Sequence, residues 1–165
     1  MRIQTVGSHQ IIDLRHRVLR AGLPRESAIF DGDDEPYAIH LAAILESQEV
    51  VGCCTFIRRA WNDAPAWQLR GMAVENALQR GAGQSRAENA IDPSGSETVS
   101  KVGVGSTLLI FAENLPEIRS YSSQLWCNAR ESARGFYEKH GWLIESGRFD
   151  IPTAGPHFRM SRRLN

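Results

Sequence analysis

The first regular pattern in the chain is an apolar repeat at helical spacing. Ile11, Leu14 and Val18 lie three and four residues apart, which places them on one face of a helix. Gly22 and Pro24 follow, and residues of these types commonly end helices. The pattern therefore predicts an amphipathic helix within the stretch IIDLRHRVLRAGL.

Three apolar stretches that suit β-strands come next. They are residues 38–46, 50–60 and 66–74, and the short polar turns SQE and WNDAP separate them. Because short turns favour pairing between neighbours, we expect a three-stranded antiparallel meander. The acidic stretch FDGDDEP, residues 30–36, precedes it and predicts a solvated loop, with an ion site as the alternative.

The apolar pattern stops after Val74. Residues 81–101 are rich in Gly, Ser, Asn and Glu and have no sustained apolar period, which is typical of a mobile insertion. Helical spacing then resumes at Leu108, Leu109, Ala112 and Leu115. We expect a helix that begins near Ser106 and ends at Pro116.

The last third of the chain alternates strand and helix patterns. SQLWCNA predicts a strand, RESARGFYEKHG a helix that Gly141 ends, and WLIESGRFD and HFRMSRRL two further strands. Helices and strands in this order predict a mixed α/β fold in which loops at strand ends hold a ligand. We expect a single domain over residues 1–165 that carries the insertion.

The charge balance narrows the classes of function. Nineteen Lys and Arg residues balance nineteen Asp and Glu residues, so the chain has no net field to attract nucleic acid or an anionic membrane. No apolar run approaches the ~20 residues of a membrane span, and the start MRIQTVGSHQ does not resemble a secretory signal. We expect a cytoplasmic protein whose partners are small molecules or proteins.

The cysteines fit that expectation. Cys53 and Cys54 are adjacent within an apolar strand pattern, and Cys127 lies in the apolar stretch LWCNA. Their spacing matches neither a redox pair nor a metal site, so we expect buried free thiols and no metal.

A pair of glycines precedes the second predicted helix. Gly103 and Gly105 leave their backbone N–H groups unobstructed, and the positive end of the helix dipole would point at whatever lies in that loop. Phosphate is the natural ligand for such a loop. Because Gly-x-Gly is a weak signal alone, a plain turn before a helix is the alternative.

Three blocks of sequence resemble the GNAT superfamily, the acyl-CoA-dependent N-acyltransferases. They are WQLRGMAVENALQR with GVGSTLLIFAEN, then LWCNARESARGFYEKHGW, and finally GPHFRMSRRL, so the resemblance covers nearly the whole chain. It implies a mostly antiparallel central sheet of about six to seven strands flanked by helices. It also implies acetyl-CoA as the acyl donor, with its pyrophosphate in the glycine loop.

The chain departs from the family pattern in one place. The family loop runs Gln/Arg-x-x-Gly-x-Gly/Ala without a break, whereas here some twenty residues separate Gln79 and Arg80 from Gly103. A rival loop, QRGAG, follows directly, but no apolar-faced helix comes after it. The resemblance implies that acetyl-CoA contacts Met72, Ala73, Val74, Gln79, Arg80, Gly103, Val104, Gly105, Ser106, Thr107, Asn128, Ala133 and Phe136.

Among these residues, three carry a specific expectation. Ala73 and Val74 act through their backbone groups, which pair with the pantetheine amides like an added strand and polarise the thioester oxygen. For Asn128, a bond to the pantetheine arm and a helix N-cap are both open.

Tyr137 matches the family's general acid. A phenol titrates near pH ~10 and a thiol near ~8.5, so a tyrosine is protonated at neutral pH and can donate to the departing sulfur. The alternative is a tyrosine that only packs. Its neighbour Phe136 is expected to face the core, three residues after Ala133.

The general base has several candidates. His157 lies near the expected acceptor site by resemblance, His40 suits a core histidine, and Glu75 suits an exposed charge after a strand. A chain of water molecules is a further alternative.

The function that follows is direct transfer of an acetyl group from acetyl-CoA to a primary amine of a small molecule or peptide. The acidic stretch FDGDDEP hints at a cationic acceptor, and a homodimer is left open. The alternative is a non-catalytic acyl-CoA-binding module of the same fold. A dinucleotide-binding fold is disfavoured, because Gly103 follows a polar stretch and not a strand.

Overall fold

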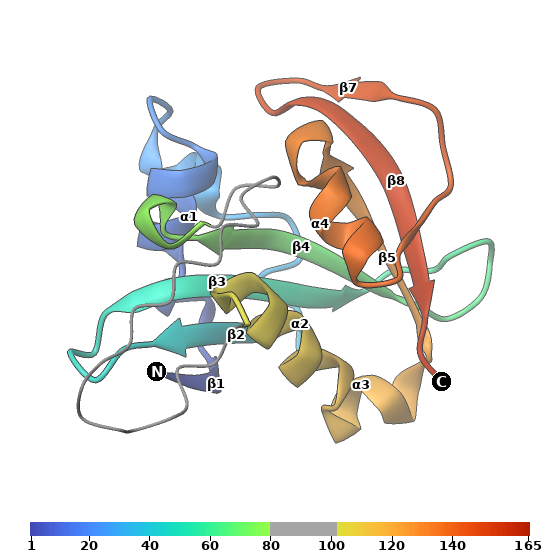
Figure 1. Cartoon of the computed structure of the whole chain (residues 1–165), viewed down its shortest axis with the longest axis horizontal. Coiled ribbons are helices and arrows are strands. Elements are labelled where there is room, and N and C mark those ends of the chain that lie inside the picture. Colours follow the sequence, from blue (N-terminus) through green and yellow to red (C-terminus); the bar gives the residue numbers. More distant parts are fainter. Residues whose placement is uncertain (80–101) are drawn as a thin grey trace, which may run out of the picture.

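A computed structural model describes residues 1–79 and 102–165 of the chain (Figure 1). The strands are β1 (Arg2–Val6), β2 (Ile39–Ile44), β3 (Val50–Arg58), β4 (Trp67–Val74), β5 (Gln124–Arg130), β6 (Leu143–Ile144), β7 (Phe149–Ile151) and β8 (Gly155–Arg163). The α-helices are α1 (Ile12–Leu19), α2 (Val104–Glu113), α3 (Pro116–Tyr121) and α4 (Arg134–Lys139). The predicted insertion at residues 81–101 lies outside the described residues.

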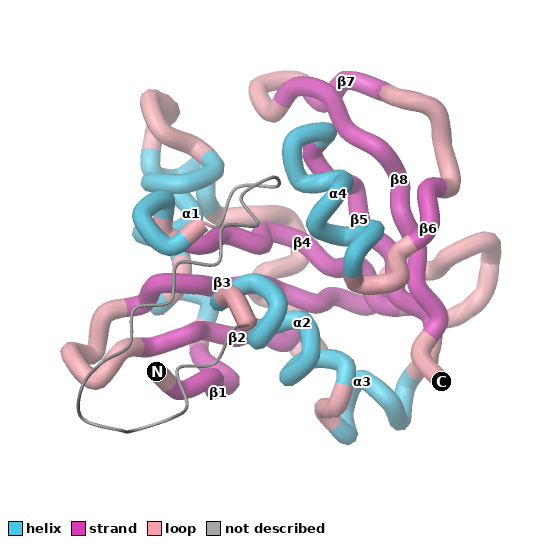
Figure 2. Tube along the Cα trace, viewed as in Figure 1, coloured by secondary structure: helices cyan, strands magenta, loops and turns pink. Residues whose placement is uncertain are grey.

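One mixed sheet organises these elements. Its order is β1-β2-β3-β4-β5-β8-β6, and β7 pairs with β8 (Figure 2). The pairs β2–β3 and β3–β4 are antiparallel, which confirms the predicted meander. β4 and β5 are parallel, and β5 and β8 are antiparallel again. The expected mixed, mostly antiparallel fold is therefore confirmed.

The described residues form more strands than the six to seven expected. β1 was not predicted, because Ile3 and Val6 are the apolar residues of a short edge strand that pairs with β2. The stretch WLIESGRFD was expected as one strand, and it forms β6 and β7. A bend at Ser146 and Gly147 separates the two, and Ser146 Oγ donates to the Gly147 carbonyl at 2.8 Å.

Pro116 begins a helix as well as ending one. It occupies the first turn of α3, where its missing N–H costs nothing because that group has no intrahelical acceptor. α2 ends at Glu113, and its apolar side at Leu108, Leu109 and Ala112 is buried as predicted. It starts at Val104, slightly before the expected Ser106.

The core lies on both faces of the sheet. A larger apolar cluster joins β2–β5 and β8 to α2 and α4, and it holds the fully buried indoles of Trp67 and Trp142. A smaller cluster joins the other face of β2–β4 to α1 through Leu14. α2 approaches β3 closely at Gly52, where an added Cβ would lie 2.5 Å from Val104 Cγ1. Within the described ranges, no helix is long and apolar enough to span a bilayer.

Candidate active site

The two central parallel strands pair briefly and then separate. Trp67–Leu69 pair with Leu125–Cys127, after which β4 continues to Val74 and β5 to Arg130 without pairing to each other. Figure 1 shows β4 running toward α1 while β5 passes behind α4. We call the region between the unpaired ends of β4 and β5 the split. Within residues 1–79 and 102–165, the backbone groups on the facing edges of these strand ends have no strand partner, and they can bind an extended ligand.

A β-bulge shapes the β4 side of the split. Cys53 pairs with Ala73 and Thr55 with Arg70, so two β4 residues, Gly71 and Met72, stand opposite one residue of β3. Gly71 has a φ of +56°, a conformation that glycine adopts readily. This bulge was not predicted from the sequence, although a lone glycine within a strand pattern is a known signal for one.

Beyond the bulge, the backbone of Val74 turns toward the split. The N–H of Glu75 donates to the Val51 carbonyl at 2.8 Å, so Glu75 and Val51 are a hydrogen-bonded pair of the β3–β4 ladder. Such pairs alternate along antiparallel strands, and the N–H and C=O of Val74 therefore point away from β3. The side-chain amide of Gln79 donates to that Val74 carbonyl at 2.7 Å.

The glycine loop, which contains Gly103 and Gly105, lies next to Met72 on the β4 side of the split. An ideal Cβ on Gly105 would lie 3.3 Å from Met72 Cε and 3.3 Å from the Phe136 ring. The first helical bond of α2 runs from the Thr107 N–H to the Gly103 carbonyl at 3.0 Å. The N–H groups of Val104, Gly105 and Ser106 precede that bond and have no intrahelical acceptor. No acidic residue occupies this first turn.

Tyr137, on α4, contacts both Met72 and Phe136. Its side chain is 6% exposed, and its hydroxyl donates to Met72 Sδ at 3.5 Å. The Trp142 ring packs at 5.3 Å and the Phe136 ring at 5.2 Å between centroids. Burial raises the pKa of Tyr137 well above 10.0, so the phenol is neutral at physiological pH. Phe136 and Ala133 also pack on the core, but Tyr137 is the more deeply buried of the two adjacent rings.

Asn128 lies within β5 and not at its end. The strand runs to Arg130, and Arg130 precedes the helical turn Glu131–Ala133, so the N-cap interpretation of Asn128 is wrong. Cys127 and Ala129 face the larger core cluster, which places Asn128 on the opposite face at the edge of the split. Its Oδ1 is buried, and among the described residues it has no hydrogen-bond partner. A buried unpaired oxygen is unusual, and a bound water or ligand group would satisfy it.

The two residues expected at the start of the family loop, Gln79 and Arg80, have different outcomes. The Gln79 side chain bonds to the Val74 carbonyl and, at 2.9 Å, to Asn76 Oδ1, so it is engaged within its own turn. Arg80 lies outside the described residues.

The three base candidates differ in how their atoms are used. His40 is buried, with Nδ1 2.8 Å from Thr55 Oγ1 and Nε2 2.8 Å from the Asp33 carbonyl. Burial lowers the pKa of His40, and the core interpretation is confirmed. Glu75 bonds to Arg17 at 2.9 Å, an interaction that lowers the pKa of this carboxylate and makes it a weaker base.

His157 is placed differently, on β8 opposite Arg130. It is buried, and its Nδ1 is 2.7 Å from the Gly155 carbonyl. A carbonyl can only accept, so the neutral ring carries its proton on Nδ1 and its lone pair on Nε2. This is the tautomer that a base acting through Nε2 requires.

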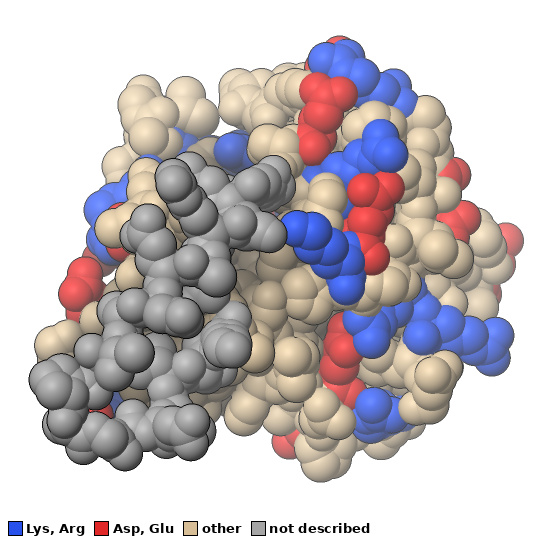
Figure 3. All heavy atoms as spheres, in the orientation of Figure 1, with Lys and Arg blue, Asp and Glu red and all other residues tan. Residues whose placement is uncertain are grey.

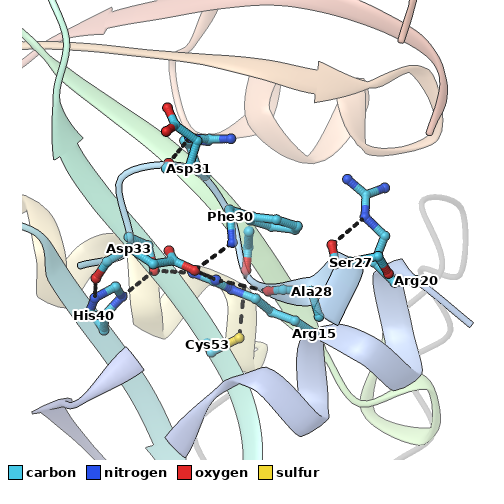
Figure 4. Close-up of polar contacts among 12 residues, drawn as sticks. Arg15, Arg20, Ser27, Ala28, Phe30, Asp31, Asp33, His40 and Cys53 are labelled. Atoms are coloured by element: carbon cyan, nitrogen blue, oxygen red, sulfur yellow. Dashed lines mark hydrogen bonds and ion pairs between the residues drawn. The ribbon is translucent and has the colours of Figure 1, made fainter. Parts of the chain in front are cut away.

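The acidic loop is not fully solvated, contrary to expectation. Asp33 is buried and pairs with the fully buried Arg15 at 2.6 Å, and the Phe30 N–H donates to Asp33 Oδ2 at 2.8 Å (Figure 4). A signal for this pair is present in the sequence, because Arg15 lies four residues after Ile11 on the apolar side of α1.

The thiols of Cys53, Cys54 and Cys127 are free and buried, as predicted. Burial raises the pKa of Cys53 to about 11 and those of the other two further, so all three are protonated at neutral pH. Across the described ranges, no group of three or more His, Cys, Asp or Glu side chains is arranged to hold a metal ion.

Comparisons with known proteins point to one fold. No family model matches the chain. An uncharacterised N-acetyltransferase of Bacillus subtilis, YitI, is 28% identical over an alignment of 168 positions that covers 99% of this chain and 97% of that protein.

Two solved structures show the same architecture. An aminoglycoside 6'-N-acetyltransferase complexed with coenzyme A has a TM-score of 0.67 at 18% identity, with 100% of this chain and 98% of that chain covered. An acetyltransferase of the GNAT family from Staphylococcus aureus has a TM-score of 0.62 at 15% identity, with coverages of 99% and 100%. The fold resemblance recognised in the three sequence blocks is thereby confirmed.

Proposed function

We propose that this chain, which has the GNAT fold, is an N-acetyltransferase that moves the acetyl group of acetyl-CoA directly to a primary amine of a small molecule or peptide. One observation carries the proposal. Gly105 of α2, Met72 of β4 and Phe136 of α4 meet at the split, and the Tyr137 hydroxyl lies against Met72. A glycine loop, unpaired strand backbone and a neutral phenol thus converge from segments far apart in sequence.

The residues at the split fit acetyl-CoA. The N–H groups of Val104, Gly105 and Ser106 suit a pyrophosphate, because they lie at a helix N-terminus with no acid in its first turn. The outward backbone of Val74 and the unpaired Oδ1 of Asn128 suit the amides of the pantetheine arm. Acetyl-CoA supplies the activated thioester carbonyl.

Tyr137 is the proposed general acid. The amine nitrogen forms a bond to the carbonyl carbon, the carbon–sulfur bond breaks, and the sulfur leaves as a thiolate that needs a proton. The Tyr137 hydroxyl already donates to a sulfur atom, that of Met72. Because the pKa of Tyr137 is raised, complete transfer of its proton to the thiolate is unfavourable. The hydrogen bond from its hydroxyl instead stabilises the negative charge that develops on the departing sulfur.

His157 is the proposed base. In the part of the chain that the structure describes, His157 Nε2 has no hydrogen-bond partner, so its lone pair suits proton removal from the amine. Both ring nitrogens of His40 are engaged, and Glu75 is paired with Arg17. The free thiols suit a reducing compartment, and we place the protein in the cytoplasm on that ground.

Calorimetric titration with acetyl-CoA tests the donor site. Gly105→Glu puts a negative charge at the loop and a side chain against Met72 and Phe136, so we expect affinity to fall by at least ~100-fold. Gly147→Glu is the matched control, because a Cβ there meets nothing within 4 Å.

Equal affinity in the two variants would refute the loop assignment. If the wild-type protein binds acetyl-CoA but releases no CoA with any amine, the non-catalytic module is the better description.

A further inference from the structure

Arginine side chains gather around one aromatic ring on the α1 face of the split. The Cζ atoms of Arg15, Arg20 and Arg70 lie 4.7, 5.1 and 5.7 Å from the centre of the Phe30 ring. Figure 4 shows the Phe30 ring above the buried Arg15–Asp33 pair, with the Arg20 guanidinium directed away from that pair.

Arg130 extends the cluster across the split. It is the last residue of β5, and its guanidinium donates to the Leu19 carbonyl at the end of α1 at 2.9 Å. Arg70 lies on β4, next to the bulge at Gly71. Arg70 and Arg130 therefore lie on the two strands that border the split.

The carboxylates near these arginines form ion pairs with Arg15 or Arg59. Asp33 is paired with Arg15, while Glu35 and Asp31 pair with Arg59 at 2.6 and 3.6 Å. Within residues 1–79 and 102–165, Arg20, Arg70 and Arg130 form no ion pair, and each donates to a backbone carbonyl instead.

Their positive charges are also only partly solvated. Burial lowers the pKa of Arg70. The charges of Asp33 and Asp31 oppose this shift, and Arg15 adds to it by a smaller amount. Burial and the nearby Arg20 likewise lower the pKa of Arg130. An anion brought to these groups would relieve the repulsion between Arg20 and Arg130 and accept hydrogen bonds from the guanidinium N–H groups.

The cluster is separate from the glycine loop. Leu69 and Ala129 face the larger core cluster with α2 and α4, so the adjacent Arg70 and Arg130 point to the opposite face. A ligand group held by the arginines would thus meet the split from the side of α1, while the N-terminus of α2 meets it from the other.

We propose that Arg20, Arg70 and Arg130 bind an anionic group of the acceptor, so that the substrate is a small amine carrying a carboxylate or phosphate. The inference rests on the proposed acetyltransferase function and names its acceptor class. Polycationic acceptors such as aminoglycosides are disfavoured, because these guanidiniums would repel them.

The first experiment measures acetyl transfer by CoA release. The probes are the proteinogenic amino acids, O-phosphoethanolamine and glucosamine 6-phosphate, against spermidine and kanamycin. Amino acid amides, ethanolamine and glucosamine are the analogues that lack the anionic group. We expect turnover of at least one anionic amine, and kcat/KM at least ~10-fold lower for its analogue without the anionic group. The amino acid and phosphate arms separate the two anion types. Preference for the cationic amines would overturn the proposal.

The second experiment uses variants. Arg130→Gln and Arg20→Gln should raise KM for the anionic amine at least ~10-fold and leave acetyl-CoA affinity unchanged. Arg163→Gln, the same charge change at the far end of β8, is the control. Arg130→Lys retains the charge and should recover part of the loss. Because a lysine can also donate to the Leu19 carbonyl, the unchanged acetyl-CoA affinity of Arg130→Gln is the result that excludes a purely structural role. Equal KM in the Arg130 and Arg163 variants would refute the site.

A binding readout separates this inference from the proposed function. Calorimetry with the same anionic amines, without acetyl-CoA, reports the arginine site even if no transfer occurs. Binding to wild type that Arg130→Gln weakens supports the site. Binding that is absent, or unaffected by the substitution, overturns it, whatever the outcome of the acetyl-CoA titration.

Discussion

The two faces of the sheet at the split have opposite chemistry. On the face covered by α2 and α4, the groups are a neutral phenol, a thioether, a phenylalanine ring and a glycine loop. On the face covered by α1, they are guanidiniums, a buried ion pair and a histidine hydrogen-bonded on both nitrogens. In Figure 3 the face of α2 and α4 shows tan surface between scattered charged residues.

Alternation along two strands creates this difference. Leu69 faces the apolar side and Arg70 the other, and on β5 the same holds for Ala129 and Arg130. Neighbouring side chains of a strand point to opposite faces of the sheet. One strand can therefore present an apolar face to a thioester and a charged face to an acceptor. At the split the two strands are not paired with each other, so a thioester on one face and an acceptor on the other can come into contact there.

Tyr137→Phe is expected to have the largest effect, and it disables only the face of α2 and α4. The ring and its packing are kept while the donor to sulfur is lost, so kcat should fall by ~10²–10⁴ with acetyl-CoA affinity nearly unchanged. Single-turnover kinetics with saturating acetyl-CoA measure the chemical step.

Tyr121→Phe, on α3 and packed on Trp67, is the matched control for loss of a phenolic hydroxyl. A Tyr137→Phe enzyme that kept its rate within about twofold while chemistry was rate-limiting would show that the hydroxyl only packs.

Gly71→Ala should disrupt the β4 bulge at Gly71 and Met72, which borders both faces of the sheet. A Cβ there would lie 2.6 Å from Arg15 Nε, and Arg15 cannot move aside because it is fully buried and paired with Asp33. Left-handed strain and the clash together should lower the free energy of unfolding by roughly 2–4 kcal/mol, measured in urea.

Gly22→Ala isolates the strain. Gly22 also has a positive φ, +81°, but a Cβ there meets nothing within 4 Å. We expect Gly22→Ala to be the milder substitution by ~1–3 kcal/mol, and an equal loss in both variants would mean that the Arg15 contact is easily relieved.

The smallest effect concerns the buried polar network of the α1 face. Burial lowers the pKa of His40 in the folded protein, whereas the unfolded chain takes up a proton near the ordinary value of 6.5. Protons therefore bind preferentially to the unfolded state, and stability is lost as the pH falls below 6.5 toward the lowered pKa. The slope is at most ~1.4 kcal/mol per pH unit.

Urea unfolding at several pH values measures this loss. His40→Gln should flatten the dependence between pH 7 and 5, while the same substitution at exposed His9 should leave it as in the wild type. A wild-type profile that stays level over this range would contradict the assignment.

Local patterns in the sequence were enough to predict most elements. The repeat Ile11, Leu14, Val18 predicted α1, and the three apolar stretches predicted the meander, because an amphipathic period follows directly from which side chains must be buried. The glycine pair before an apolar helix and the block ARGFYEKHGW also indicated where a donor site would lie. These features depend on residues close together in the chain.

Features made by distant residues depended on the tertiary structure. The bulge at Gly71, the depth of Tyr137 beneath Met72 and the Arg15–Asp33 pair each join separate elements. The gathering of Arg20, Arg70 and Arg130 at one opening likewise needs α1, β4 and β5 in place. A chain with zero net charge gives no hint of that local excess, because composition sums charges that folding separates in space.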